Sequence, residues 1–507
     1  MSSIANRTIA KNTLFLYGRK GFTLIVALYI SRLLLQRLGV TDFGIYGIVG
    51  SVVAIFSSLR GIFSSSIQRF INIAKGKGLE DKVNEIFSLG LKIHGWISVL
   101  FFLFVEIGGT IMMHYLDIPS DKFTDAYIVL QFSLLTAIVT ILTVPYDALI
   151  IANEKFNAYA LFSILDSVLK LIVVILLIYS PISRLVAYSC LLFIVSLIIR
   201  SINTIYCHRQ FGQVSRYHKV NNKQLLKEMT GFAGWQFLGN TAFHLSQEGI
   251  NIVINIMGGV VVNAARTIAY QAKNAITQFT SDLNLSFQPR TMMHYAQGNR
   301  KEFYQLLFIN SKANFAISTI LAFIIFVLAE SVVRLWLGEI PPYSVGFIRA
   351  IMIYLVIRSL HAPIDLFFKS HGKIRDYQII EICILSLSLP LSWCIIKLRF
   401  PYYAVFLGMA LCEAINMIAI IILAKVKYGF DLVQYLHSVA IRSVICITIL
   451  SIAGWILLLT INFDHITLLK TLIYSIILFM IACITVTITL FSRKEVNSLI
   501  TLVRLKR

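Results

Sequence analysis

About fourteen long apolar runs take up most of this 507-residue chain and leave almost no room for a soluble domain. A run of about 20 mostly apolar residues is long enough to cross a bilayer as a helix. Only 14% of the residues are charged, whereas a soluble domain usually has about 25%. We therefore predict an all-α integral membrane protein. Its predicted transmembrane helices are residues 12–36, 43–66, 85–112, 123–145, 157–180, 183–206, 230–257, 264–289, 304–329, 345–368, 375–396, 402–424, 437–460 and 466–491.

A short internal repeat relates two halves of this set of helices. Residues 145–159 read PYDALIIANEKFNAY and residues 363–377 read PIDLFFKSHGKIRDY, and the same offset of 218 residues aligns the apolar runs. We therefore predict two six-helix lobes and an extra C-terminal pair of helices in contact with lipid. The predicted domains are an N-terminal lobe at 1–206, a basic cytoplasmic linker at 207–229, a C-terminal lobe at 230–424, and helices 13 and 14 with a basic tail at 425–507.

The basic residues are unevenly divided between the two sets of loops. The net charge of +21 comes from short Lys and Arg clusters between apolar runs, a pattern that argues against a nucleic-acid partner. One set of loops and both tails carry about 25 of these residues, and the other set carries about 6. We expect the basic side, with both termini, to be cytoplasmic. Both copies of the repeat then face the cytoplasm, so the repeat is a parallel one.

Two consecutive predicted helices carry polar side chains along their full length. Lipid cannot face such stripes, so they face other helices or water. A water-filled cavity is the interpretation that we favour, and a dry polar seam between helices is the alternative. The stripe residues are Gln236, Asn240, His244, Gln247, Glu248, Asn251 and Asn255 in the seventh helix, and Arg266, Tyr270, Lys273, Thr277, Ser281, Asn284 and Gln288 in the eighth.

Charged residues also lie deep within the predicted spans. The basic ones are Arg19, Arg60, Lys170, Lys273, Lys312 and Arg358, and the acidic ones are Glu106, Asp166, Glu248, Glu381 and Glu413. An unpaired charge at mid-membrane costs about 3 kcal/mol, so the basic residues need acidic partners or an anion. Asp166 and Lys170 lie one helical turn apart and can neutralise each other. Arg suits phosphate because its planar guanidinium donates two hydrogen bonds at once, and amide and Tyr side chains suit sugar hydroxyls.

The sequence has no motif for nucleotide binding, hydrolysis or metal binding. There is no GxxxxGK[ST] for ATP, and no HExxH, GxSxG or cluster of His and Cys for a hydrolase or a metal. The predicted outer loops are about 15 residues or shorter, which leaves no sizeable domain for a glycosyltransferase. We therefore expect neither an enzyme nor a metal centre.

Four stretches resemble those of a known family of membrane proteins. They are LGVTDFGIYGIVGSVVAIF at 38–56, FINIAKGKG at 70–78, PYDALIIANEKFNAY at 145–159 and FQPRTMMHYAQGNRKEF at 287–303. With the two lobes and the added pair, they resemble bacterial Wzx-type flippases of O-antigen and capsule. These flippases belong to the multidrug/oligosaccharidyl-lipid/polysaccharide exporter superfamily.

The resemblance implies a central cavity between the lobes and a cargo of undecaprenyl-pyrophosphate-linked oligosaccharide. Alternating access would move the cargo to the outer leaflet of the bacterial inner membrane for surface polysaccharide assembly, with the lipid tail along helices 13 and 14. The implied partners are this lipid-linked oligosaccharide, membrane lipid, and a polysaccharide polymerase with other glycan assembly proteins. No cofactor is implied, and coupling to H⁺ or Na⁺ stays open.

The candidate site residues follow from the resemblance and the polar pattern together. Those expected to hold pyrophosphate are Arg19, Arg60, Lys273 and Arg358. Those expected to contact sugars are Asn240, His244, Asn251, Tyr270 and Asn284, and the candidates for ion coupling are Glu106 and Glu248. The alternatives are a cation-coupled multidrug exporter, against which the basic residues argue, and a non-transporting scaffold for glycan synthesis, against which the polar stripes argue.

Overall fold

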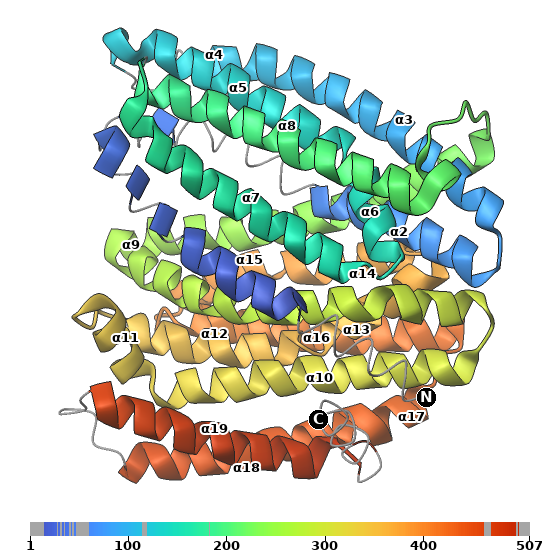
Figure 1. Cartoon of the computed structure of the whole chain (residues 1–507). Helices are drawn as coiled ribbons and strands as arrows, with labels where there is room; N and C mark the ends of the chain where they lie inside the picture. Colours follow the sequence, from blue (N-terminus) through green and yellow to red (C-terminus); the bar gives the residue numbers. More distant parts are fainter. Residues whose placement is uncertain are drawn as a thin grey trace, which may run out of the picture. The chain divides into compact units, whose positions relative to one another are not determined.

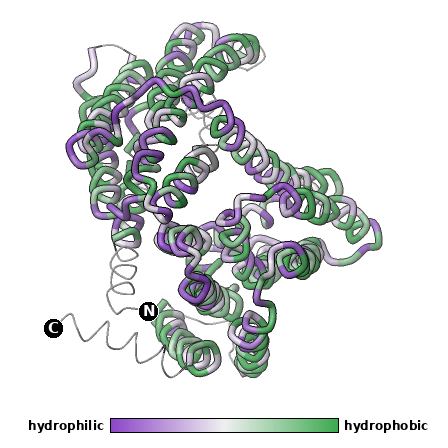
Figure 2. The backbone as a smooth tube through the Cα atoms, turned by 90° about the vertical axis from the view of Figure 1, so that its right-hand side faces the viewer, coloured by the Kyte–Doolittle hydropathy of each residue, from purple (hydrophilic) through white to green (hydrophobic). Residues whose placement is uncertain are grey.

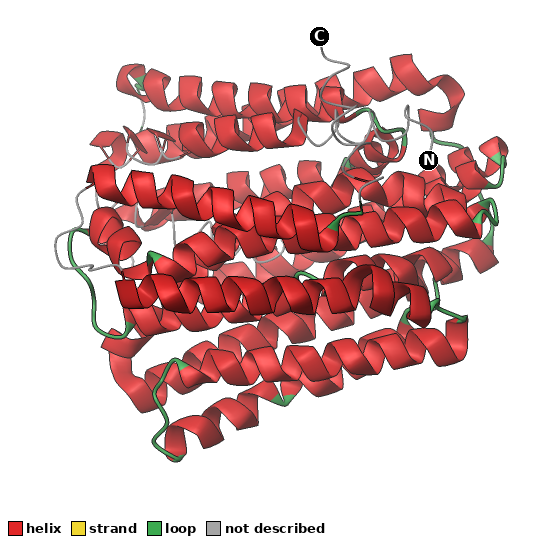
Figure 3. Ribbon diagram, turned by 90° about the horizontal axis from the view of Figure 1, so that it is seen from below, coloured by secondary structure: helices red, strands yellow, loops and turns green. Residues whose placement is uncertain are grey.

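The computed structural model consists of helices, and the residues that it describes include no β-strand (Figures 1 and 3). The described residues are 15–27, 29–30, 33–34, 36–39, 42, 45–46, 60–113, 119–181, 183–460, 468–492 and 495. Of the predicted span at 12–36, residues 15–27, 29–30, 33–34 and 36 are described and helical, whereas most of the predicted span at 43–66 lies outside the described residues.

Ten described helical segments are long and apolar enough to cross a membrane. They coincide with predicted spans three to six and nine to fourteen. Hydrophobic residues predominate along these helices (Figure 2), and each helix satisfies its backbone hydrogen bonds internally, as a bilayer requires. The chain is therefore a multi-pass integral membrane protein, and the all-α prediction is confirmed.

The described residues form two compact units. The N-terminal unit comprises residues 10–234 together with 292–298, and the C-terminal unit comprises 235–291 and 299–507. The helices of the N-terminal unit are α2 (Arg60–Gly76), α3 (Glu80–Phe104), α4 (Thr110–Met113), α5 (Phe123–Leu142), α6 (Val144–Ala152), α7 (Phe156–Leu176) and α8 (Arg184–Phe211). A π-helical turn at Val105–Gly109 joins α3 to α4.

The basic segment after α8 is held against α3 rather than extending freely. The Nδ2 atom of Asn84 donates to the carbonyl oxygens of Gln213 and Arg216, each at 2.8 Å. The Asn222 amide donates to Glu85 at 2.9 Å, and its oxygen caps the next helix by accepting from the Leu225 N–H. These bonds fix the path of the predicted linker against α3.

Two of the stretches that carry the family resemblance meet at the end of α2. A Cβ atom at Gly76 would lie 2.7 Å from the Met293 carbonyl oxygen and 2.6 Å from the Ala296 Cβ. Met293 and Ala296 belong to the same compact unit as Gly76, because that unit includes residues 292–298. Only glycine permits this approach, because the obstructing atoms include backbone that cannot rotate away.

Replacing Gly76 by alanine is expected to destabilise the protein by about 1–3 kcal/mol, because the added methyl group overpacks this contact. The measurement is the thermal unfolding midpoint of the purified protein. Gly95→Ala is the matched control, because its Cβ would meet nothing within 4 Å in the middle of α3. The packing argument is wrong if the two variants unfold at the same temperature.

The C-terminal unit contains most of α9 (Lys223–Ala296) and all of the later helices. These are α10 (Arg300–Val327), α11 (Ala329–Leu337), α12 (Ser344–Arg358), α13 (His361–His371), α14 (Arg375–Ser386), α15 (Ser388–Lys397), α16 (Ala404–Tyr428), α17 (Leu432–Tyr435), α18 (Ile441–Thr460) and α19 (Leu468–Leu490). Helix α12 packs on α10 and α16, and α14 also packs on α16.

Helix α9 is two helices joined at a sharp turn. Gly259 has a φ of 77°, a left-handed conformation that costs glycine nothing, and it divides α9 into the predicted spans at 230–257 and 264–289. The two arms are bonded side by side, because the Arg266 guanidinium donates to the Gln247 carbonyl oxygen at 2.9 Å. Both polar stripes therefore belong to one helical hairpin.

The sequence repeat has the same backbone form in both units. The turn between α6 and α7 contains Glu154 with a φ of 55°, and the turn between α13 and α14 contains Gly372 with a φ of 80°. These two residues are separated by the predicted offset of 218. A left-handed residue is uncommon outside glycine, so its recurrence at the equivalent position supports a true structural repeat.

The repeated aspartates are buried to different extents. Asp147 is 5% exposed and binds the Arg200 guanidinium at 3.2 Å and the Asn203 amide at 2.7 Å. Its equivalent, Asp365, is 24% exposed and pairs with Lys369 at 2.7 Å, one turn along α13.

Asp147→Ala is therefore expected to cost about 3–5 kcal/mol, the usual effect of leaving a buried charge without its partner. Asp365→Ala is the matched control and should cost much less, because Asp365 is more exposed than Asp147 and its pair with Lys369 lies within one helix. Thermal unfolding of both purified variants measures the difference. If both variants lose the same stability, burial of the aspartate does not determine the strength of the pair.

The last two spans pack on the C-terminal unit through α10. Helices α18 and α19 contact each other and α10, and many of their other large apolar side chains are exposed, as lipid-facing residues would be. Beyond α19, Glu495 accepts from the buried Lys312 Nζ at 2.8 Å. Burial would raise the pKa of the Glu495 carboxyl, but the bonds from Lys312 and the Ser492 N–H lower it below its ordinary value.

Candidate functional site

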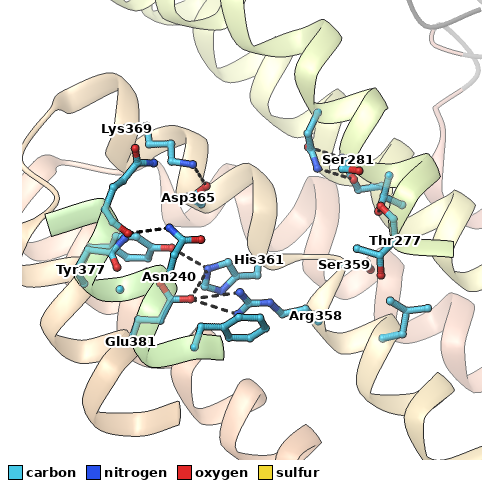
Figure 4. Close-up of a pocket in the computed structure, with 18 of the residues that line it drawn as sticks. Asn240, Thr277, Ser281, Arg358, Ser359, His361, Asp365, Lys369, Tyr377 and Glu381 are labelled. Carbon is cyan, nitrogen blue, oxygen red and sulfur yellow. Dashed lines mark hydrogen bonds and ion pairs between the residues drawn. The ribbon is translucent and has the colours of Figure 1, made fainter. Parts of the chain in front are cut away.

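A polar cavity of about 320 Å³ lies within the C-terminal unit. Both arms of α9 line it, together with side chains of α10, α12, α13 and α14 (Figure 4). This volume is at the lower end of the roughly 300–1,000 Å³ that is usual for ligand pockets. The polar lining residues are Gln236, Asn240, His244, Thr277, Thr280, Ser281, Asn284, Asn314, Ser318, Arg358, Ser359, His361, Asp365, Lys369, Tyr377, Gln378 and Glu381.

A cluster of charged side chains forms one wall of the cavity. The Arg358 Nη1 atom lies 2.8 and 2.9 Å from the two carboxylate oxygens of Glu413, which is completely buried. Arg358 Nη2 also donates to Glu381 at 3.3 Å. The helices explain this geometry, because Arg358 ends α12, which packs on the helix that carries Glu413.

His361 connects the two carboxylates of this cluster. Its Nε2 atom lies 2.8 Å from the Tyr377 hydroxyl and 3.3 Å from Glu381 Oε1, and its Nδ1 atom lies 3.1 Å from Glu413 Oε1. Figure 4 shows the imidazole between Arg358, Glu381 and Tyr377. Both ring nitrogens therefore face oxygen atoms of neighbouring side chains.

Most of the deep basic residues in the described part have an acidic partner. Lys170 pairs with Asp166 at 2.7 Å, as predicted, and Lys312 and Arg358 pair with the carboxylates described above. Arg19 lies over the Tyr159 ring at 5.0 Å in the N-terminal unit. Arg60 begins α2, and its side chain lies outside the described residues.

Lys273 differs from these residues. Its Nζ atom lies 4.3 Å from the centre of the Tyr270 ring, and Arg266 lies over the same ring at 4.2 Å. Among the residues that the structure describes, no carboxylate forms an ion pair with Lys273. A cation–π contact offsets only about 0.5–2 kcal/mol of the cost of burying this charge. Lys273 is one turn before Thr277, which lines the cavity.

Three of the five predicted sugar contacts line the cavity. They are Asn240, His244 and Asn284, and the Asn284 amide is bonded to Asn314 at 3.0 Å. The other two, Asn251 and Tyr270, are not among the lining residues: Asn251 donates to Glu248 at 3.1 Å, and Tyr270 donates to Gln247.

The two candidates for ion coupling lie in different surroundings. Glu248 is exposed on α9. Glu106 lies in the π-helical turn of the N-terminal unit, where it accepts from the Tyr127 hydroxyl at 3.1 Å and from the Gln131 amide at 3.0 Å. Both of these donors are neutral side chains. The coupling role of Glu106 and Glu248 stays a prediction.

Sequence reasoning found the deep acidic residues Glu381 and Glu413 but missed that they pair with Arg358. Arg358, His361 and Asp365 were visible as one helical face, because they are spaced three and four residues apart. Glu381 and Glu413 had no evident partner, because their neighbours come from other helices. Their isolation in otherwise apolar spans was the signal that each needs a partner from another helix.

The sequence of the chain matches a known family over more than half of its length. Residues 9–286 match the family described as polysaccharide biosynthesis protein. The chain belongs to this family. No curated protein is similar enough in sequence to be matched.

Solved structures show the same fold at low sequence identity. A MATE structure in the bent conformation is 12% identical, covers 89% of this chain and 97% of its own, and has a TM-score of 0.75. An outward-facing multidrug resistance MATE transporter of the MOP superfamily is 13% identical, covers 83% and 95%, and has a TM-score of 0.73.

A third structure is a MOP superfamily transporter from Pyrococcus furiosus, for which reverse polarity of the binding pocket is said to suggest a different function. It is 12% identical, covers 83% of this chain and 95% of its own, and has a TM-score of 0.70. This family member therefore has a MATE-like fold, and the predicted superfamily fold is confirmed. These identities are too low to transfer a substrate.

Proposed function

We propose that this family member flips polyprenyl-pyrophosphate-linked oligosaccharide across the bacterial inner membrane, by alternating access, for surface polysaccharide assembly. Membership of the polysaccharide biosynthesis protein family supports a glycan cargo. The single observation that carries the proposal is Lys273, a deep cation without a carboxylate partner in the described part, one turn from a cavity lined by amides and hydroxyls. A phosphate at Lys273 and a sugar in the cavity would satisfy both groups.

The proposal assigns different roles to the basic residues. Lys273 is the principal pyrophosphate ligand of this proposal, and the roles of Arg19 and Arg60 stay predictions. Arg358 is a weaker candidate, because its guanidinium already binds Glu413 and Glu381 and a phosphate would have to displace one of them. Asn240, His244 and Asn284 contact sugar, and the polymerase and other assembly proteins receive the flipped product.

Deletion of the gene, followed by extraction of lipids and of surface polysaccharide, tests this function in cells. We expect pyrophosphate-linked oligosaccharide to accumulate while surface glycan is lost, and the accumulated lipid then identifies the sugar. Unchanged glycan with raised sensitivity to cationic dyes would instead favour a multidrug exporter. If a chain with apolar replacements along the stripe of 236–255 restored the glycan, the scaffold alternative would be favoured.

A further inference from the structure

The cations that line the cavity are paired with carboxylates, so none of them is left for an anionic ligand. Of the two lining residues with a permanent positive charge, Arg358 binds Glu413 and Glu381, and Lys369 binds Asp365 at 2.7 Å. These two cations are paired with three carboxylates, of which Glu381 and Asp365 line the cavity and Glu413 is completely buried beside Arg358. Protonation of His361 brings the cluster to neutrality, and a neutral His361 leaves it with a net negative charge. In neither state is the wall positive.

The remaining lining groups are those that bind hydroxyl and amide groups. Gln378 is 3% exposed, and its Oε1 atom is a buried acceptor without a hydrogen bond from the described residues. A buried acceptor of this kind costs about 1–3 kcal/mol unless a ligand donates to it. Asn240, Thr277 and Ser281 line the same space. A ligand with hydroxyl or amide donors fits this set.

We propose that this cavity holds a sugar of the cargo that is uncharged, recognised through its hydroxyl and acetamido groups, and that it rejects a uronic acid at the same position. The inference rests on the proposed function and adds a substrate class to it. A uronic acid would bring a further carboxylate close to Glu381 and Asp365 in a partly desolvated space, where like charges repel strongly. The pyrophosphate lies outside this cavity, near Lys273.

Two synthetic polyprenyl-pyrophosphate disaccharides test this selectivity, one ending in glucose and the other in glucuronic acid. They differ only at C6, which is a hydroxymethyl group in one and a carboxylate in the other. Their binding to the purified full-length protein in lipid nanodiscs is measured by native mass spectrometry. We expect the glucose lipid to bind at least tenfold more tightly. Equal binding, or preference for glucuronic acid, overturns the inference and leaves the proposed function intact.

Binding of neither lipid would contradict the proposed function and this inference together. Variants locate the source of the selectivity. Glu381→Gln should reduce the preference for glucose severalfold, because it removes a negative charge from the wall. If this variant fails to fold, Asp365→Asn, at a more exposed position, provides the same test. Glu330→Gln is the control, because Glu330 pairs with Arg349 and does not line the cavity. A preference that neither wall variant changes overturns the inference.

Discussion

Arg358→Met is expected to lower the stability of the protein by about 3–5 kcal/mol, the usual loss when one member of a buried ion pair is removed. The substitution keeps most of the side-chain volume but leaves Glu413, which is completely buried, and Glu381 without their cation. Thermal unfolding of the purified protein and its yield in the membrane measure the effect. The double variant Arg358→Met, Glu413→Gln should recover part of the loss, because it also removes the uncompensated buried charge.

Arg349→Met provides the matched control for this prediction. Arg349 pairs with Glu330 at 3.5 Å, and both side chains are about one-third exposed, so the pair should contribute no more than about 1 kcal/mol. If Arg358→Met and Arg349→Met unfold at the same temperature, the ion pairs of Arg358 with Glu413 and Glu381 do not stabilise the protein more than a surface pair does.

Lys273→Ala is expected to reduce surface glycan at least tenfold while protein abundance stays normal. A hydrogen bond between a charged side chain and phosphate contributes about 1.5–3 kcal/mol, which corresponds to roughly ten- to a hundredfold in affinity. Lys273→Arg should retain most of the function, because the positive charge remains. The measurement is surface polysaccharide in a deletion strain that carries each variant.

Lys301→Ala is a suitable control, because Lys301 is exposed in the first turn of α10. Arg60→Ala belongs in the same series as the second predicted phosphate ligand. Wild-type glycan in both the Lys273→Ala and Arg60→Ala strains, at normal protein abundance, would refute the proposed anion site.

Much of the fold could be predicted from the sequence, because a bilayer permits few solutions. Every apolar run of sufficient length has to form a helix, and ten of these runs did so at the predicted places. The polar stripes of α9 were also visible, because polar residues on one side of a helix recur at helical spacing. The hairpin at Gly259 follows from the short gap between two such stripes.

The composition of the site could be predicted only in part, because ion pairs depend on which helices touch. Arg358 was predicted as a phosphate ligand from its type and depth, yet its nearest charged groups come from α14 and α16. The partner of Lys312 lies beyond α19, more than 180 residues away in the sequence. By contrast, the Asp166–Lys170 pair was predictable, because both residues lie on one helix, one turn apart.

The most direct test of the central proposal is transport by the purified protein alone. The full-length chain is reconstituted into liposomes with a fluorescent polyprenyl-pyrophosphate disaccharide, and a membrane-impermeant reagent measures the fraction in the outer leaflet over time. We predict rapid exchange between leaflets with the wild-type protein and at least tenfold slower exchange with Lys273→Ala. Exchange no faster than in protein-free liposomes, from a protein shown to be folded by its thermal transition, would contradict the account.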